Sequence, residues 1–368
     1  MSEKQKNIII SGGGTGGHVF PAIAIANALK VIEPDINILF VGAEDRMEME
    51  KVPEAGYEII GLPVSGIQRK LTWKNLKVPL RLLKSLLMAK KIIKNFNPDV
   101  VVGVGGYASG PILKIASARK IPTLIQEQNS YAGITNRMLA KKAMKICVAY
   151  EGMDKYFPAE KIKITGNPVR ENLQVSKINK KEAAEYFNLR PDRKTILSIG
   201  GSLGAASINE SIIKNLHNFE KSNVQLIWQC GKLYHKKASE HINKYKLNNV
   251  MLKDFINRMD MAYAAADLII SRAGAGTISE LALVKKPVIL VPSPNVAEDH
   301  QTRNAKTLVD KGAAVLIKDN EANTELIKKA LEVINDDTKL NELSSNIQNM
   351  AKQNSAKLIA EEILKLIN

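Results

Sequence analysis

Glycine-rich segments that follow short apolar runs are the part of this sequence most able to do chemistry. There are three of them, at residues 11–18, 103–107 and 200–204. Glycine lacks a Cβ atom, so the backbone amides of such a segment can approach a phosphate closely, and a following helix adds partial positive charge. One segment of this kind is a common nucleotide signature. Three, spread over both halves of the chain, predict two phosphate-bearing ligands and favour a transferase.

His18 ends the first glycine segment, close to the expected start of a helix. The positive end of a helix disfavours the imidazolium form, so a neutral His18 could accept a proton at neutral pH. The alternative is a histidine that only hydrogen-bonds a loop carbonyl or a phosphate. The chain contains no Asp-x-Asp sequence, which is usual in metal-dependent sugar transferases. We therefore expect a diphosphate to be held by backbone amides and arginine, with no metal ion and no cofactor.

A second candidate site begins at Ser271 and continues through small residues to Glu280. A strand that ends there, followed by a helix from about Thr277, would let the backbone approach a ligand. Glu280 has two interpretations that the residues alone leave open: it can complete a capping box with Thr277, or its carboxylate can accept hydrogen bonds from two ribose hydroxyls. Gln301, near the start of a later helix, carries both a donor and an acceptor, which suits a sugar hydroxyl.

The first glycine segment also contains Gly12-x-Gly14-x-x-Gly17, the pattern of a dinucleotide-binding loop. In such loops an acidic residue follows about twenty residues later, whereas Glu44 lies clearly further downstream. A nicotinamide enzyme would also leave the glycine segment of the second half unexplained. The pattern alone is therefore weak support for NAD binding.

Strands alternate with helices around these segments in both halves, and 368 residues with 45% hydrophobic content exceed what one core usually holds. We expect two Rossmann-like, doubly wound α/β domains. The N-terminal domain spans 1–165 and the C-terminal domain 166–340, and a C-terminal helix at 341–368 packs back towards the N-terminal domain. The helices that matter below are predicted over 21–31, 78–95, 277–285 and 299–311, and the tail ends in one helix from about 338 to 367.

The two cysteines, Cys147 and Cys230, lie in different halves of the chain. Their number disfavours a disulfide framework and a zinc site, and fits the reducing cytoplasm. We expect both thiols to be buried as small apolar groups. No apolar run approaches the roughly 18 to 20 residues that span a bilayer, and the N-terminus does not have the pattern of a signal peptide.

The formal net charge is +16, and the basic residues are unevenly distributed. No acidic residue lies between Glu58 and Asp99, whereas nine lysines and arginines do. The predicted helix at 78–95 has an apolar stripe and basic neighbours, namely Leu82, Leu83, Leu86, Leu87, Ala89 and Ile93 with Lys77, Arg81, Lys84 and Lys91. It could be a core helix with a solvated basic face, a surface that rests on anionic lipid, or part of a nucleic-acid binder, for which Trp73 alone is thin support. We favour the anionic membrane surface.

Seven motifs, taken together and in order, resemble the MurG family, glycosyltransferase family 28. They cover nearly the whole chain and lie at 13–21, 103–107, 126–129, 166–170, 200–205, 272–280 and 299–301. Other glycosyltransferases of the GT-B fold share at most two or three of them. The resemblance implies a GT-B architecture, with two Rossmann-like domains and a cleft between them, the acceptor on the N-terminal domain and UDP-GlcNAc mainly on the C-terminal one.

The resemblance also implies an activity in peptidoglycan synthesis, and with it a link to cell shape and cell division. GlcNAc would pass, with inversion, from UDP-GlcNAc to the MurNAc C4 hydroxyl of undecaprenyl-diphospho-MurNAc-pentapeptide (lipid I) to give lipid II. The implied partners are these substrates, the anionic inner leaflet and proteins of wall synthesis and division, with no nucleic acid. The enzyme would be peripheral, on the cytoplasmic face of the cell membrane. The alternative is another GT-B UDP-sugar enzyme, an epimerase or a glycolipid transferase.

Residue roles follow from the resemblance, motif by motif. The residues near the acceptor diphosphate and the donor sugar would be Thr15, Gly16, Gly17, Tyr107 and Asn129. The donor phosphates would contact Arg170 and Ser202, and uracil would contact the backbone of Ile256. Arg272 would be a further donor-binding residue. The amides offered to the diphosphate would be those of Ala275, Gly276, Thr277, Ile278 and Ser279. Glu280 would take the ribose hydroxyls and Gln301 the GlcNAc hydroxyls. The catalytic base would be His18 or Glu127, and the sequence does not separate the two.

Overall fold

The computed structural model describes residues 5–64, 78–169, 178–201 and 204–367. Its chain divides into two compact units. The first comprises Met1–Val169 together with Lys352–Asn368, and the second comprises Arg170–Ala351. Among the described residues, no helix is both long enough and apolar enough to cross a membrane.

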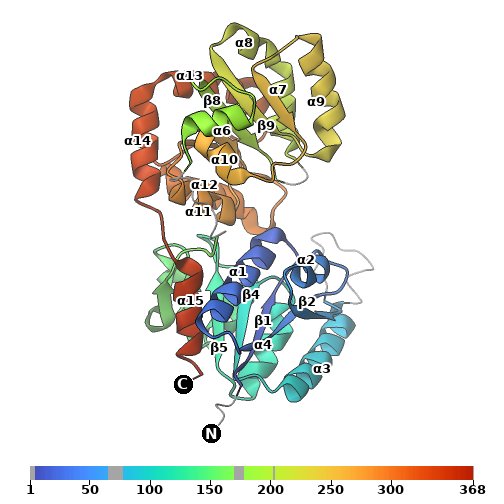
Figure 1. Ribbon diagram of the computed structural model, residues 1–368. Coiled ribbons are helices and arrows are strands. Elements are labelled where there is room, and N and C mark those ends of the chain that lie inside the picture. Colours follow the sequence, from blue (N-terminus) through green and yellow to red (C-terminus); the bar gives the residue numbers. More distant parts are fainter. Residues whose placement is uncertain (1–4, 65–77, 170–177, 202–203, 368) are drawn as a thin grey trace. The chain divides into compact units, whose positions relative to one another are not determined.

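A seven-stranded parallel sheet forms the centre of the first unit, in the order β3-β2-β1-β4-β5-β6-β7. Its strands are β1 (Asn7–Gly12), β2 (Asn37–Ala43), β3 (Glu58–Leu62), β4 (Val100–Gly105), β5 (Thr123–Glu127), β6 (Lys145–Val148) and β7 (Ile162–Ile164). Its α-helices, labelled in part in Figure 1, are α1 (Gly16–Ile32), α2 (Glu48–Glu54), α3 (Val78–Phe96), α4 (Ser109–Ala118), α5 (Ile134–Ala140) and α15 (Ser355–Leu364).

Successive residues of the central strands are buried on opposite faces of this sheet. Ile8 and Ile10 of β1 join the apolar cluster that α1 and α15 cover. Ile9, between them, joins the cluster under α3 and α4. All three side chains are fully buried, as expected for a parallel sheet with helices on both faces.

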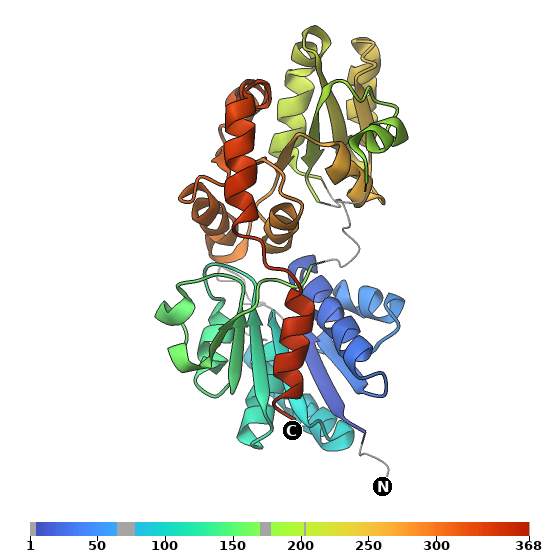
Figure 2. The same cartoon turned by 60° about the vertical axis from the view of Figure 1, so that its left-hand side comes forward.

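The last helix of the chain, α15, lies against α1 (Figures 1 and 2). Its Ile359 and Ile363 are buried in the cluster that contains Ile8, so the chain ends in the unit where it began. The prediction of one helix from about 338 to 367 is wrong. The chain leaves helical geometry between α14 (Asp337–Gln348) and α15, where Asn354 has a left-handed φ of 58°.

A six-stranded parallel sheet forms the second unit, in the order β10-β9-β8-β11-β12-β13. Its strands are β8 (Lys194–Ile199), β9 (Val224–Gln229), β10 (Val250–Lys253), β11 (Leu268–Ser271), β12 (Val288–Leu290) and β13 (Val315–Leu316). Its α-helices are α6 (Lys180–Tyr186), α7 (Ala206–Lys214), α8 (Leu216–Lys221), α9 (Lys232–Lys244), α10 (Met259–Ala265), α11 (Ala275–Leu283), α12 (His300–Val309), α13 (Ala322–Asn335) and α14.

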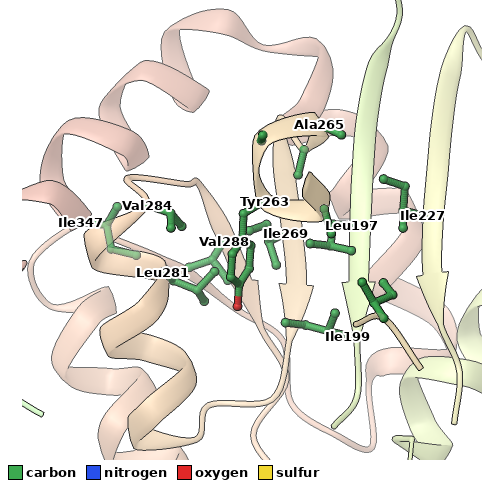
Figure 3. Packing of buried hydrophobic residues seen from close by; sticks show 14 of the residues in the cluster. Leu197, Ile199, Ile227, Tyr263, Ala265, Ile269, Leu281, Val284, Val288 and Ile347 are labelled. Atoms are coloured by element: carbon green, nitrogen blue, oxygen red, sulfur yellow. The ribbon is translucent and has the colours of Figure 1, made fainter. Parts of the chain in front are cut away.

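The second sheet is also covered on both faces. Leu197 of β8 packs with α10 and α11, and its neighbour Ile196 packs with α7 and α13. Figure 3 shows the first of these clusters, where the ring of Tyr263 from α10 lies beside Leu281 and Val288. This packing fixes an aromatic ring that reaches the candidate site described below.

The strand orders confirm the predicted pair of doubly wound α/β units. In each sheet the order reverses once, between β1 and β4 in the first unit and between β8 and β11 in the second. Open α/β sheets bind ligands at such a reversal, at the carboxyl ends of the strands. The three glycine segments and the segment after Ser271 follow these four strands.

Helix starts are where the sequence prediction differs most from the structure. Helix α1 begins at Gly16 rather than near 21, so Pro21 lies inside it, and α11 begins at Ala275 rather than near 277. In both cases glycines occupy the first helical turn, which a propensity argument assigns to the loop. Among the described residues, the helices that were not predicted are α2, α5, α6, α8 and α9. All but α9 are short, with seven residues in α2, α5 and α6 and six in α8.

Both cysteines are free and buried, as predicted. Burial raises the pKa of the Cys147 thiol to about 12 and that of the Cys230 thiol to about 11. Both thiols therefore stay protonated at neutral pH and act as small apolar side chains.

Gly106 should tolerate a side chain much less well than Gly56, although both have nearly the same left-handed φ, 84° and 85°. A Cβ on Gly106 would lie 2.3 Å from the oxygen of Gly13, whereas a Cβ on Gly56 would meet nothing within 4 Å. Gly56→Ala should cost about 1–2 kcal/mol of unfolding free energy for the backbone conformation, and Gly106→Ala about 1–3 kcal/mol more for the collision. Urea denaturation measures both. Equal losses would contradict the close packing of the two glycine segments.

Candidate functional site

The first two glycine segments touch each other at the carboxyl ends of β1 and β4. The amide of Gly13 donates to the oxygen of Gly105 at 3.3 Å, and Gly106 is pressed against the Gly13 backbone. The segment after β5 joins them, because Gln128 Nε2 donates to the oxygen of Val104 at 2.6 Å. Tyr107, which follows Gly106, is 58% exposed. The structure thus brings three of the predicted motifs together in the first unit.

A buried carboxylate that sequence reasoning missed holds the first glycine loop. Glu48, the first residue of α2, is 0% exposed. Its two oxygens accept from the Gly14 amide at 2.9 and 3.0 Å, and one also accepts from the Ala43 amide at 3.0 Å. The Gly14 amide therefore already has an acceptor. The signal in the sequence was a carboxylate just after a buried strand that itself ends in small residues.

The start of α1 is the part of this loop that can bind an anion. The first amides of a helix have no acceptor within the helix, and α1 has no acidic residue in its first turn and no side-chain cap from Thr15. Thr15 and Gly17 are exposed and Gly16 is partly exposed. Thr15, Gly16 and Gly17 thus stand where helix geometry favours negative charge.

His18 is oriented by the same loop. Its Nδ1 lies 3.0 Å from the oxygen of Gly13 and 3.4 Å from Thr15 Oγ1. A carbonyl oxygen can only accept, so Nδ1 carries the hydrogen, and a neutral ring then has its lone pair on Nε2. That edge of the ring packs on Gly105, where a Cβ would lie 2.9 Å from Nε2.

Glu127 is the last residue of β5 and is buried. One of its oxygens accepts from the amide and the Nδ2 of Asn129, at 3.0 and 3.2 Å. The other accepts from the Gly133 amide at 3.0 Å and from Asn136 Nδ2 at 2.8 Å. The carboxylate therefore ties the segment that carries Asn129 to the start of α5.

In the second unit, Glu280 is held by the core rather than by a helix cap. Helix α11 begins at Ala275 with Gly274 as its N-cap, so Thr277 lies inside the first turn and the capping box with Glu280 is wrong. Glu280 instead accepts a hydrogen bond of 3.0 Å from the hydroxyl of buried Tyr263. The carboxylate is partly exposed, so it can also accept hydrogen bonds from a ligand.

Small residues leave the start of α11 open. A Cβ on Gly276 would meet nothing within 4 Å, and the residues from Ala275 to Thr277 are partly exposed. The Ile278 amide donates to the oxygen of Gly274, and Ser279 Oγ donates to the oxygen of Ala275 at 3.0 Å. The amides of Ala275, Gly276 and Thr277 therefore have the geometry of an anion-binding helix start. The amides of Ile278 and Ser279, also expected to meet the diphosphate, lie beyond this first turn, and that of Ile278 is engaged within the protein.

Arg272, predicted to contact the donor, is engaged within the protein. Its Nη1 pairs with Asp319 and donates to the oxygens of Val291 and Pro292 at 3.0 and 3.3 Å. Its Nη2 donates to Ser207 Oγ at 3.1 Å. The guanidinium thus joins the start of α7, the end of β12 and the segment before α13.

Two glutamines connect neighbouring loops of the second unit. Gln301 Oε1 accepts from the Ser293 amide at 2.8 Å. Gln229, which sequence reasoning missed, accepts from the Ile256 amide at 3.0 Å and donates to the oxygen of Gly201 at 3.1 Å. Ile256 was expected to meet uracil through its backbone, and the amide of that backbone has a partner inside the protein. A polar residue at the end of the apolar strand β9 was the signal for Gln229.

The backbone before Gln301 is strained. Glu298 and Asp299 have consecutive left-handed φ values of 50° and 54°. This conformation costs free energy in residues other than glycine and is found most often at functional sites.

Two other predicted site residues, Arg170 and Ser202, lie outside the described residues.

The comparisons with known proteins agree with this geometry. The model of the glycosyltransferase family 28 N-terminal domain matches residues 8–148, and that of the family's C-terminal domain matches residues 195–363. The chain is 60% identical over 365 residues to the UDP-N-acetylglucosamine–N-acetylmuramyl-(pentapeptide) pyrophosphoryl-undecaprenol N-acetylglucosamine transferase of Parabacteroides distasonis, with 99% of each chain covered. It is 52% identical over 364 residues to the protein of the same name from Flavobacterium psychrophilum, covering 99% of this chain and 98% of that one.

Solved structures agree as well. The crystal structure of Acinetobacter baumannii MurG is similar with a TM-score of 0.80 and 29% identity, over 98% of this chain and 99% of that one. UDP-GlcNAc 2-epimerase from Neisseria meningitidis, at 17% identity and a TM-score of 0.67 over 98% of this chain and 100% of that one, shares the fold alone. The two parallel-sheet units match the GT-B fold, and the chain belongs to glycosyltransferase family 28.

Proposed function

We propose that this protein transfers GlcNAc from UDP-GlcNAc to the MurNAc C4 hydroxyl of lipid I, giving lipid II and UDP. The observation that carries the proposal is the full-length identity of 51–60% to curated relatives that are named for this transfer. Anion-binding helix starts in both units, α1 and α11, support it. The process is peptidoglycan synthesis at the cytoplasmic face of the cell membrane, where proteins of wall synthesis and division are the expected partners.

Incubation with labelled UDP-GlcNAc and a lipid I analogue tests the activity. UDP should appear only when the acceptor is present, and EDTA should not abolish the reaction. Consumption of UDP-GlcNAc without an acceptor would instead indicate an epimerase, the activity named for several solved proteins of the same fold.

The donor belongs to the second unit in this proposal. The diphosphate meets the first amides of α11, those of Ala275, Gly276 and Thr277, because the Ile278 amide already donates to the oxygen of Gly274. Arg170 and Ser202 are further phosphate ligands. Glu280 accepts from the ribose hydroxyls, and Gln301 keeps its Nε2 for the sugar while its oxygen holds Ser293. Arg272 positions the surrounding loops through Ser207 and Asp319. Ile256 meets uracil through its backbone, for which Gln229 sets the loop.

The acceptor belongs to the first unit, near Thr15, Gly16, Gly17, Tyr107 and Asn129. His18 is the base. Its Nε2 takes the proton of the C4 hydroxyl as that oxygen bonds to the anomeric carbon, and the bond from this carbon to the diphosphate oxygen breaks with its electron pair passing to UDP. Glu127 positions Asn129, because four donors already engage its two oxygens.

Helix α3 supplies the membrane contact. Its second half packs into the core through Ala89, Ile92 and Ile93. Its first half exposes large apolar side chains, Leu80 at 70%, Leu82 at 47%, Leu83 at 56% and Leu87 at 61%. The neighbouring Arg81, Lys84, Lys90 and Lys91 are exposed as well, while Lys77 lies outside the described residues. Exposed leucines flanked by cations suit an anionic lipid surface.

Glu280→Ala should raise the KM for UDP-GlcNAc about 10- to 100-fold, because a hydrogen bond to a charged group contributes about 1.5–3 kcal/mol. Tyr263→Phe keeps the buried ring and removes only the hydroxyl that orients Glu280, so it should raise the KM less, with kcat nearly unchanged. Steady-state kinetics at varied donor concentration measures both variants. A Glu280→Ala protein with a lower melting temperature and a normal KM would show that Glu280 only anchors Tyr263.

His18→Ala should lower kcat by about 10²- to 10⁴-fold with little change in donor KM, as expected on removal of a general base. The measurement is turnover of the lipid I analogue at saturating donor. Near-normal turnover in this variant would transfer the role to Glu127 or to water.

Replacement of Lys77, Arg81, Lys84 and Lys91 by glutamate should abolish sedimentation with anionic vesicles, since each cation near such a surface contributes about 1 kcal/mol. Turnover of a short-chain, water-soluble acceptor should persist. A matched control replaces four exposed lysines of the second unit by glutamate, namely Lys181, Lys232, Lys236 and Lys328. This control should sediment like the unmodified protein. Vesicle binding that survives the first set, or a short-chain reaction that fails with it, contradicts the proposed surface.

A further inference from the structure

One peptide group of the first glycine loop is hydrogen-bonded on both of its sides. It joins Gly13 to Gly14. Its N–H, from Gly14, donates to the Glu48 carboxylate at 2.9 and 3.0 Å. Its C=O, from Gly13, accepts from His18 Nδ1 at 3.0 Å. The N–H and C=O of a trans peptide point in opposite directions, so this one group connects the carboxylate to the imidazole.

Glycines line the space that the Glu48 side chain occupies, because a Cβ atom at these positions would collide with it. A Cβ on Gly13 would lie 2.0 Å from Glu48 Oε1, and a Cβ on Gly42 would lie 2.6 Å from Glu48 Cγ. Glu48 is fully buried, and among the described residues its hydrogen-bond donors are the amides of Gly14 and Ala43, with no ion pair. Burial of an unpaired charge is costly. Its position at the first residue of α2 offsets part of that cost.

A carboxylate in this position changes the chemistry of the peptide beyond it. Its negative charge polarises the N–H bond of Gly14, which increases the negative charge on the Gly13 oxygen, because linked hydrogen bonds strengthen one another. A more negative oxygen is a better acceptor for Nδ1–H of His18. The ring is then held in one tautomer with its lone pair on Nε2, and the imidazolium formed by proton uptake is stabilised. In serine hydrolases a carboxylate does this by direct contact with histidine.

We propose that Glu48 is a positioning residue for His18, acting through the Gly13–Gly14 peptide to keep the hydrogen on Nδ1 and to increase the basicity of Nε2. The catalytic consequence rests on the proposed role of His18 as base. The tautomer and the basicity do not, because they are properties of the protein without substrate.

Among the described residues, the other charged groups of α1 and of the elements packed against it pair with one another or lie at the far end of the helix. The strands β1 and β4 contain no ionisable side chain. On α2, Lys51 pairs with Glu50 and Glu54, both at 2.9 Å, at the surface. On α15, Glu361 lies 4.0 Å from Lys357, and Glu362 pairs with Lys145 and Lys365. Lys30 lies in the last turn of α1, at the other end from His18. Glu48 is the carboxylate that the Gly13–Gly14 peptide links to the ring.

The tautomer is tested first in the unmodified protein by ¹⁵N NMR of labelled histidine rings. The chain has five histidines, and the His18 signals are assigned by their loss in His18→Asn. The neutral ring should have its hydrogen on Nδ1, although the Nε2–H form is the commoner one in water. An Nε2–H ring overturns the proposal, and this measurement does not depend on any Glu48 variant folding.

Glu48→Gln keeps the size of the side chain and removes its charge. In this variant the pKa of His18, followed by the same NMR signals, should fall by about 0.5–1 unit. A charge in direct contact with the ring would shift the pKa by about 1–3 units. The matched control is Glu50→Gln, which removes the same charge from the exposed side of α2 and should leave that pKa in place. Equal shifts of the His18 pKa in the two variants would overturn the proposal. So would an unchanged His18 pKa in Glu48→Gln, which is the result expected if Glu48 only holds the loop in place.

The pH profile of kcat/KM then separates this proposal from the proposed function. If His18 is the base, the acidic limb of the profile should move to lower pH in Glu48→Gln by the same amount as the NMR titration. With a weaker base, the pH-independent rate should also fall, by at most about threefold to tenfold, the limit for complete proton transfer in the transition state. If the titration shifts and the profile does not, the link from Glu48 to His18 stands and the role of His18 as base fails.

Discussion

The pairing of β1 with β4 and of β8 with β11 is the constraint on which the rest of the structure depends. At these two places the strand order reverses, so the connections that leave the carboxyl ends diverge and expose backbone amides. The glycine segments and the small residues after Ser271 occur there. The two helix starts that we propose to bind anions, α1 and α11, therefore follow from the topology of the sheets, which places each of them at the carboxyl ends of the strands of its own unit.

Glycine serves two different purposes in these segments. Gly106 and Gly204 have left-handed φ values and are pressed against carbonyl oxygens of Gly13 and Cys230, where a Cβ would lie 2.3 and 2.1 Å away. These positions let two segments of chain pack on each other. Gly14, Gly201 and Gly276 have no heavy atom within 4 Å of such a Cβ. Open positions of this kind leave space for a ligand, so the glycines of these motifs serve both the packing of the chain and the candidate binding surface.

Polar side chains at or just beyond the ends of buried strands hold the loops in place. Glu127 ends β5, Gln229 ends β9, and Arg272 directly follows β11. Each spends its hydrogen bonds on neighbouring backbone or side chains, as buried polar groups must. Glu48 does the same for the loop after β1. Under the proposed function, the substrates would meet amides and a His18 that are already oriented, which is the arrangement that electrostatic stabilisation of a transition state requires.

The sequence by itself determined the fold class, the family and the location of the motifs, because alternating apolar strands and glycine segments are local patterns. It could not separate His18 from Glu127, or the cap from the ribose ligand at Glu280, because each choice depends on partners far along the chain. Tyr263 reaches Glu280 from another helix, and Glu48 reaches Gly14 from the next βα connection. Arg272, expected from the resemblance to contact the donor, is held by Ser207 and Asp319, which lie far from it in the sequence. Hydrogen-bond partners of buried polar groups are set by how strands and helices pack, so only the tertiary structure decided which partners hold these side chains.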